Sequence, residues 1–172
     1  QFMKTKLLFA FLSTLIFSNA FAQQVSLDYV SGLSEPSAMV HQGNMLYVQG
    51  VENLYQINTA ATSPSATVIY TAPSDFYMTN LTISGNIIYI AEEHYIEADD
   101  SFEGCRIISL DVTNLTAPAS VVYSTTQYVS SLALNGTEIY FTSETDPDDE
   151  DNFTVEVRKI NIQQVFLIRN LL

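Results

Sequence analysis

Two dense groups of carboxylates are the residues of this chain best suited to chemistry. Together they hold twelve of its nineteen acidic residues. Calcium is a hard cation that takes oxygen ligands, so oxygen-rich clusters of this kind are typical of calcium sites. The candidate calcium ligands are Asp99 and Asp100 in the first group and Asp146, Asp148 and Glu150 in the second. The two groups are Glu92, Glu93, Glu97, Asp99, Asp100 and Glu103, and Glu144, Asp146, Asp148, Asp149, Glu150 and Asp151.

The same carboxylates have a simpler interpretation as solvated loops that keep an acidic protein in solution. Residues 146–157 begin like the EF-hand calcium loop but lack glycine at its sixth position. Val157 stands where that loop has a bidentate glutamate. Calcium binding and solubility are therefore both open interpretations of these residues.

The histidines and the cysteine have no partners at a catalytic or metal-binding spacing. We expect His41 in a strand and His94 in a loop, and Cys105 as a small apolar residue of a strand. Cys105 is the only cysteine, so no disulfide can form within the chain. The sequence contains no Gly-x-Ser-x-Gly, His-Glu-x-x-His or phosphate-loop motif. Nucleophilic, zinc and nucleotide chemistry therefore have no support, and no catalytic or cofactor-binding residue is assigned.

A threefold pattern of glycine and tyrosine predicts the elements that position these groups. Gly43, Gly85 and Gly136 are 42 and 51 residues apart, and a tyrosine follows each by four residues. Each glycine separates two β-type segments, which is typical of a hairpin. A third β-type segment follows, then a fourth, in which residues 66–72 match residues 119–125. Four antiparallel strands in a unit of this length are typical of a β-propeller blade.

The expected fold is all-β, a partial β-propeller with about three four-stranded antiparallel blades in an open arc. The repeats span about residues 36–77, 78–129 and 130–162, within a propeller region of 23–162. Residues 25–30 match a fourth strand and are expected to close a ring, whereas the tail 163–172 matches nothing in the repeat. Closed propellers have about four to eight blades. The chain is therefore either the N-terminal part of a longer propeller or a unit that closes its ring by self-association through exposed blade edges.

The N-terminus and the charge bear on location and partners. Residues 1–22 have the positive end, apolar stretch and Ala20-Phe-Ala22 ending of a signal peptide. The apolar run is too short to favour the alternative of a membrane anchor. Cleavage removes two of six basic residues and none of nineteen acidic ones, leaving a net charge of about −15. We expect a secreted, periplasmic or cell-surface protein that binds neither nucleic acid nor, after cleavage, a membrane.

The segments Gly43-Asn-Met-Leu-Tyr-Val48, Ile87–Glu93 and Arg106–Asp111 resemble secreted six-bladed β-propellers of the YWTD, NHL and strictosidine-synthase-like group. The resemblance covers about residues 25–162, although the chain has no tryptophan and so lacks the YWTD motif itself. It implies a toroid in which the first strand of each blade lines a central channel. Members of the group are binding modules, scaffolds and a minority of metal-dependent hydrolases.

Residues between successive blades are the remaining candidates. Glu35, Asp75 and Tyr77 fall there, on the face that the acidic loops are expected to share. Glu35-Pro36 is similar to the metal-ligand glutamate of lactonase-like propellers, whose asparagine and aspartate ligands have no assignable counterparts here. The expected function is a secreted or cell-surface binding or scaffold module, non-catalytic in this region, with an unknown protein or carbohydrate ligand. The alternatives are a lactonase-like hydrolase whose other ligands lie beyond the chain end, and a calcium-dependent adhesion module.

Overall fold

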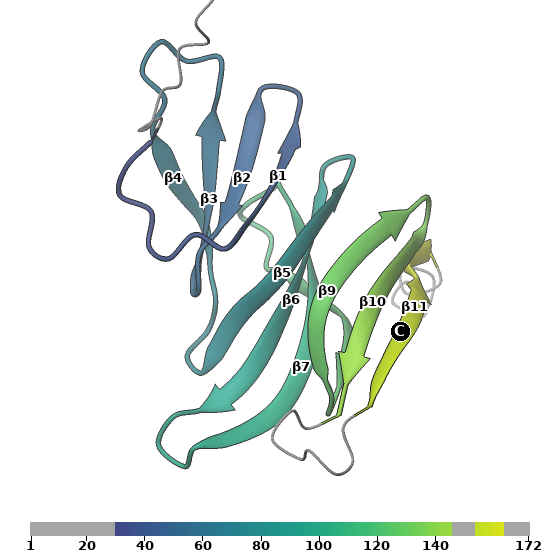
Figure 1. Cartoon of the computed structure of the whole chain (residues 1–172). Coiled ribbons are helices and arrows are strands. Elements are labelled where there is room, and N and C mark those ends of the chain that lie inside the picture. The colour runs from purple at the N-terminus through teal and green to yellow at the C-terminus, as the bar shows by residue number, and fades with distance from the viewer. Residues whose placement is uncertain (1–29, 146–153, 164–172) are drawn as a thin grey trace, which may run out of the picture.

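The structure, a computed structural model, describes residues 30–145 and 154–163, which form three antiparallel sheets (Figure 1). The first sheet contains β1 (Ala38–Gln42), β2 (Met45–Gln49), β3 (Asn53–Asn58) and β4 (Ala66–Thr71). The second contains β5 (Phe76–Ser84), β6 (Ile87–Ile96), β7 (Ser101–Asp111) and β8 (Ser120–Thr125). The third contains β9 (Tyr128–Asn135), β10 (Glu138–Glu144) and β11 (Val155–Asn161). Neighbouring strands follow chain order in every sheet, and no sheet closes into a barrel.

The predicted all-β fold of successive antiparallel sheets in an open arc is confirmed, and the arrangement is consistent with a partial propeller. The third sheet has three described strands, where the first two sheets have four. The leader 1–22, most of the expected ring-closing strand 25–30 and most of the tail 163–172 lie outside the described residues. Within the part of the chain that is described, no helix is long and apolar enough to cross a membrane.

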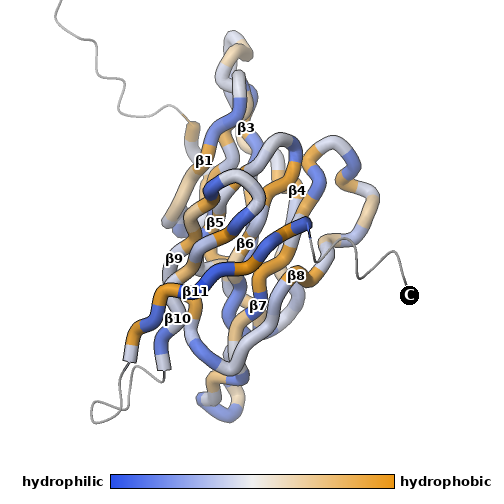
Figure 2. Tube along the Cα trace, turned by 90° about the vertical axis from the view of Figure 1, so that its right-hand side faces the viewer, coloured by the Kyte–Doolittle hydropathy of each residue, from blue (hydrophilic) through white to orange (hydrophobic). Residues whose placement is uncertain are grey.

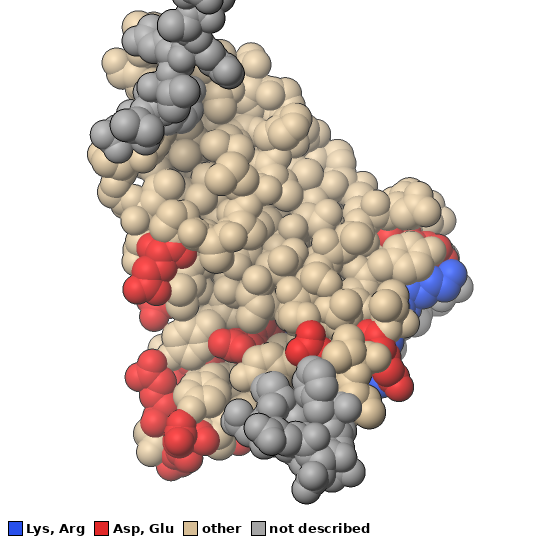
Figure 3. Space-filling model, in the orientation of Figure 1, with Lys and Arg blue, Asp and Glu red and all other residues tan. Residues whose placement is uncertain are grey.

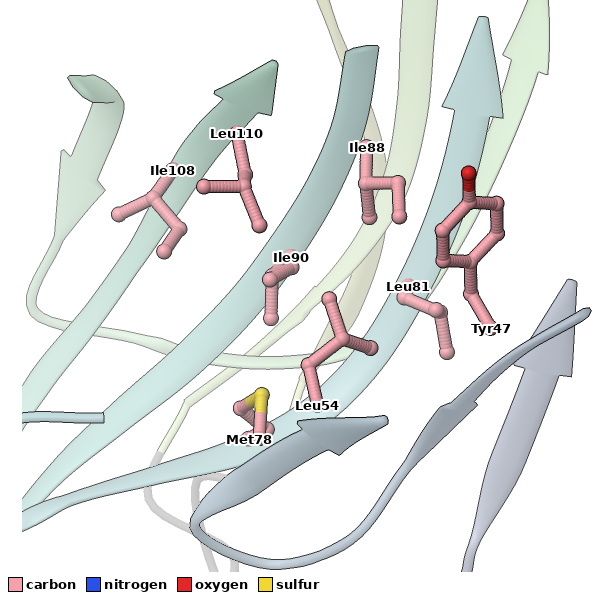
Figure 4. Packing of buried hydrophobic residues seen from close by; sticks show 8 residues of the cluster. All are labelled: Tyr47, Leu54, Met78, Leu81, Ile88, Ile90, Ile108 and Leu110. Carbon is pink, nitrogen blue, oxygen red and sulfur yellow. The ribbon is translucent and has the colours of Figure 1, made fainter. Parts of the chain in front are cut away.

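The second sheet packs against the first sheet on one face and against the third sheet on the other. It can do so because successive side chains of a strand point to opposite faces. In β6, Ile88 and Ile90 pack toward the first sheet, whereas Tyr89 and Ala91 pack toward the third. Figure 4 shows Tyr47 and Leu54 of the first sheet meeting the apolar side chains of β5, β6 and β7. The continuous apolar run of β6 follows from this burial on both faces.

The first strands of the three sheets lie side by side, with β5 between β1 and β9 (Figure 1). Two hydrogen bonds join β5 to β9. The Thr79 hydroxyl donates to the carbonyl oxygen of Val129 at 2.9 Å, and the backbone N–H of Leu132 donates to Oδ1 of Asn80 at 3.3 Å.

Candidate functional site

The first acidic group divides between a hairpin turn and the strands on either side of it. Glu97, Asp99 and Asp100 lie in the β6–β7 turn, as predicted. The prediction was wrong for Glu92 and Glu93, which lie within β6, and for Glu103, which lies within β7. His94 is likewise a strand residue of β6 and not the expected loop residue. The hairpin extends further than expected because tertiary partners stabilise polar residues that have low intrinsic strand preference.

Glu92 is a buried carboxylate with two hydrogen-bond partners, and its side chain has no exposed surface. Its Oε1 accepts a hydrogen bond from the Tyr70 hydroxyl at 2.7 Å, and its Oε2 accepts one from Nε of Arg106 at 2.7 Å. Tyr70 comes from β4 of the first sheet, whereas Glu92 and Arg106 come from β6 and β7 of the second. This buried cluster, Tyr70–Glu92–Arg106, therefore links two sheets and neutralises the buried carboxylate.

Aromatic rings extend the cluster on the second sheet. The Arg106 guanidinium lies over the Phe76 ring, 3.6 Å from its centroid. The His94 ring stacks on Phe76 with centroids 4.4 Å apart. Burial, together with the hydrogen bond to Glu92, raises the pKa of the Tyr70 hydroxyl, so that hydroxyl stays protonated and keeps donating to the carboxylate.

A groove of about 560 Å³ lies between the outer strands of the first two sheets, and Arg106, Ile108 and Leu110 of β7 are among its lining residues. We call it the rim groove. One wall is Ile69–Thr71 of β4 with Pro73, and the other is residues 115–119 and Val121. Most of its side chains are aliphatic, and Leu115 and Val121 are large hydrophobic residues that stay exposed. A smaller hollow of about 290 Å³, bordered by Phe76 and His94, shares Arg106 and Val121 with it.

The structure describes two of the five candidate calcium ligands. Asp99 and Asp100 lie exposed in the β6–β7 turn, where Asp100 has a φ of +52° and accepts a hydrogen bond from Tyr95. Asp146, Asp148 and Glu150 lie outside the described residues. Acidic side chains gather over the lower half of the face in Figure 3, where this turn lies. Residues 30–145 and 154–163 contain no group of three or more metal-ligating side chains, and calcium binding stays a prediction.

Two of the three residues expected between blades, Glu35 and Asp75, lie outside the strands, before β1 and before β5. Glu35 and Asp75 adopt positive φ in the two connections, at +44° and +65°. Glu35 and Glu52 border a small hollow of about 220 Å³ that offers two carboxylates. The prediction was wrong for Tyr77, which lies within β5 and not in a connection. Its hydroxyl donates to Glu97 at 2.9 Å, a bond that raises the pKa of Tyr77 to about 12. The structure brings neither Glu35 nor Asp75 to the rim groove.

Cys105 is buried in β7, as predicted for a small apolar strand residue. Burial raises the pKa of its thiol to about 12, which keeps the sulfur protonated and unreactive at neutral pH. His41 lies in β1, also as predicted, and is exposed there.

No protein-family model matches this chain, and no curated protein sequence matches it. Sequence reasoning identified Glu92 but assigned it to an acidic loop, and it assigned no role to Tyr70 or Arg106. A signal was present for Arg106, the one basic residue within a β-type segment otherwise made of apolar and small residues. A cation at such a position is expected to have a buried acidic partner.

Glu93 gives a test of the burial in this region. Burial raises the pKa of its carboxyl above the ordinary value of 4.5, so the folded chain binds this proton more tightly than the unfolded chain does. Its contribution to stability is therefore complete below the unfolded pKa and is lost as the pH rises through the folded pKa. We expect the free energy of unfolding of Glu93→Gln, which cannot ionise, to rise relative to that of the wild type over the range of pH above about 4.5. Urea unfolding across that range measures this, and a difference that does not vary with pH would contradict it.

Proposed function

We propose that this chain is a secreted or cell-surface binding module whose rim groove takes an extended segment of a partner protein. The observation that carries the proposal is the groove itself, a concave and mainly aliphatic surface whose lining includes the partly exposed Arg106. Clefts lined by apolar residues around a few fixed polar groups are the usual form of a binding site.

The chemistry of the groove favours a neutral apolar segment. The charge of Arg106 is balanced by Glu92, so the groove offers guanidinium N–H donors without a strong net field. The hydroxyls of Thr71 and Thr116 donate to Asn53 and Asn114, so they offer acceptor oxygens to a ligand. Carbonyl oxygens of a bound backbone suit the guanidinium donors, backbone N–H groups suit the threonine oxygens, and aliphatic side chains suit the walls.

The strands beside the groove favour an extended conformation for that segment. Among the described strands, β4 and β8 each pair on one side only, with β3 and β7. An outer strand presents backbone N–H and C=O groups to which an extended peptide can add. A carbohydrate is less well matched, because sugars stack on exposed aromatic faces, and the one aromatic lining residue, Tyr70, is committed to Glu92.

The burial and the hydrogen bonds of Glu92 favour a binding function over a hydrolytic one. It is the carboxylate paired with the lining residue Arg106, and both its oxygens accept hydrogen bonds within the buried cluster. A general base must reach the proton that it removes, and Glu92 has no exposed surface. Turnover of an ester, lactone or glycan by the purified protein would contradict a non-catalytic role.

Peptide selection tests the groove directly. Linear peptides are selected from a random display library against the purified protein, and their affinities are measured by fluorescence anisotropy. We expect Val121→Glu, which puts a charge into an apolar wall, to weaken binding by at least about tenfold, or about 1.4 kcal/mol. Val157→Glu, the same change at an exposed valine outside the groove, should bind as the wild type does. Peptides that bind the Val121→Glu variant with undiminished affinity would refute the proposal.

A further inference from the structure

The rim groove continues into the smaller hollow beside His94, which we call the His94 hollow. Arg106 of β7 and Val121 of β8 line both cavities, so the two cavities adjoin at these side chains. Figure 2 shows β7 and β8 side by side. The rim groove reaches Leu110 of β7, and the His94 hollow reaches Glu103 of the same strand. The two cavities therefore form one path along these strands.

The path has the length of a short extended segment. From Glu103 to Leu110, β7 spans roughly 20 Å at about 3.3 Å per strand residue. An extended chain that lies along this stretch covers about six residues. A segment that fills the rim groove therefore reaches the His94 hollow with a side chain about four residues further on.

A β-bulge places Glu103 at the far end of this path. The register of β6 against β7 pairs His94 with Gly104 and Tyr95 with Phe102, so Glu103 is the extra residue. Bulges re-aim a side chain and are frequent next to functional sites. Glu103 lines the His94 hollow and is exposed, so its carboxylate is accessible to a ligand.

The aromatic ring of Phe76, which also lines the His94 hollow, is covered on both sides. The His94 ring stacks on it with centroids 4.4 Å apart, and the guanidinium carbon of Arg106 lies 3.6 Å from its centroid. Two groups this close to one ring cannot share a face of it, so Phe76 lies between His94 and Arg106. No ring of a ligand can therefore stack on Phe76, which favours a flexible side chain in the hollow over an aromatic one.

Glu103 gives the His94 hollow a negative charge that no described cation balances. Its Oε1 accepts a hydrogen bond from the Ser101 hydroxyl at 3.2 Å, and no lysine or arginine of residues 30–145 and 154–163 forms an ion pair with it. Arg106 also lines the hollow, and Glu92 already balances its charge. The whole chain has a formal net charge of −13. The hollow therefore favours a cationic side chain and repels an anionic one.

We infer that the segment bound in the rim groove carries a lysine or arginine whose head group pairs with Glu103 in the His94 hollow. The inference rests on the proposed function and adds the chemistry of the partner, which has aliphatic residues in the groove and a basic residue about four positions away. The apolar stem of a basic side chain suits Val121 and Phe76, and its charged head group suits the Glu103 carboxylate.

The peptides selected against the wild-type protein test this pairing. We expect them to share a lysine or arginine about four residues from an aliphatic residue. Exchange of that basic residue for glutamine should weaken binding about fivefold, and Glu103→Gln in the protein should weaken binding of the unaltered peptide as much. The two changes together should weaken binding no more than either alone. Glu52→Gln, which removes an exposed carboxylate outside both cavities, should leave the affinity unchanged.

Leu115→Glu separates failure of this inference from failure of the proposed function. Leu115 is exposed and lines the rim groove but not the His94 hollow, so this variant should weaken binding about tenfold for basic and neutral peptides alike. Weaker binding to Leu115→Glu with unchanged binding to Glu103→Gln overturns the inference and leaves the groove in place. Selected peptides with an acidic residue at the expected basic position overturn it as well. If neither variant weakens binding, the inference and the proposed function both fail.

Discussion

Replacing Arg106 with alanine should lower the free energy of unfolding by about 3 kcal/mol or more. The change leaves the Glu92 carboxylate, which has no exposed surface, with one hydrogen bond and no compensating cation. An unpaired buried charge is among the most destabilising defects that a single substitution can create. Chemical denaturation monitored by tyrosine fluorescence measures the loss.

Two further variants separate the charge from the side-chain volume. Arg158→Ala removes an arginine whose partner Glu156 is exposed, so its cost should stay below about 1 kcal/mol. Adding Glu92→Gln to Arg106→Ala removes the unpaired charge and should restore part of the lost stability. A double variant no more stable than Arg106→Ala would show that lost packing, and not the charge, accounts for the effect.

Gly104→Ala should cost at least about 3 kcal/mol, because strain and a steric clash act together. Gly104 has a φ of +127°, and a Cβ there would lie 2.4 Å from the carbonyl oxygen of Thr125. The clash is with backbone, so no rotamer change relieves it, and the end of β8 would have to move away from β7. Thermal and urea unfolding of the variant measure the cost.

The matched control is Gly85→Ala in the β5–β6 turn. Gly85 also has positive φ, +53°, but no atom lies within 4 Å of the position of its Cβ. Its substitution should cost about 1 kcal/mol, the usual penalty of a left-handed alanine. Equal losses for the two variants would contradict the close approach of β8 to Gly104.

The sequence predicted the parts of the fold that depend on local chemistry. The glycine turns, with alternating residues on either side, predicted the hairpins at Gly43, Gly85 and Gly136, because a tight turn and a period of two are both local signals. The burial of Cys105 followed from its strand context.

The candidate site could not be predicted from local sequence patterns, because it is formed by contacts between residues that are far apart along the chain. Glu92 and Glu93 appeared to begin an acidic loop, whereas partners 22 and 14 residues away along the chain hold Glu92 inside a strand. The rim groove likewise is lined by residues of β4, of β7 and of the segment before β8, which only the packing of the sheets brings together. The sequence feature that indicated the buried cluster was Arg106, a basic residue in a strand segment otherwise made of apolar and small residues.

The order of sheet packing is the claim on which the groove and the cluster both depend, and methyl-labelled NOE spectroscopy tests it most directly. The predicted spectrum has cross-peaks between Leu54 and Leu81, across the first and second sheets, and between Ile107 and Ile139, across the second and third. It has none between Leu54 and Ile139, which belong to separate cores. A cross-peak between Leu54 and Ile139, with the other two missing, would place the first sheet on the third and contradict the account.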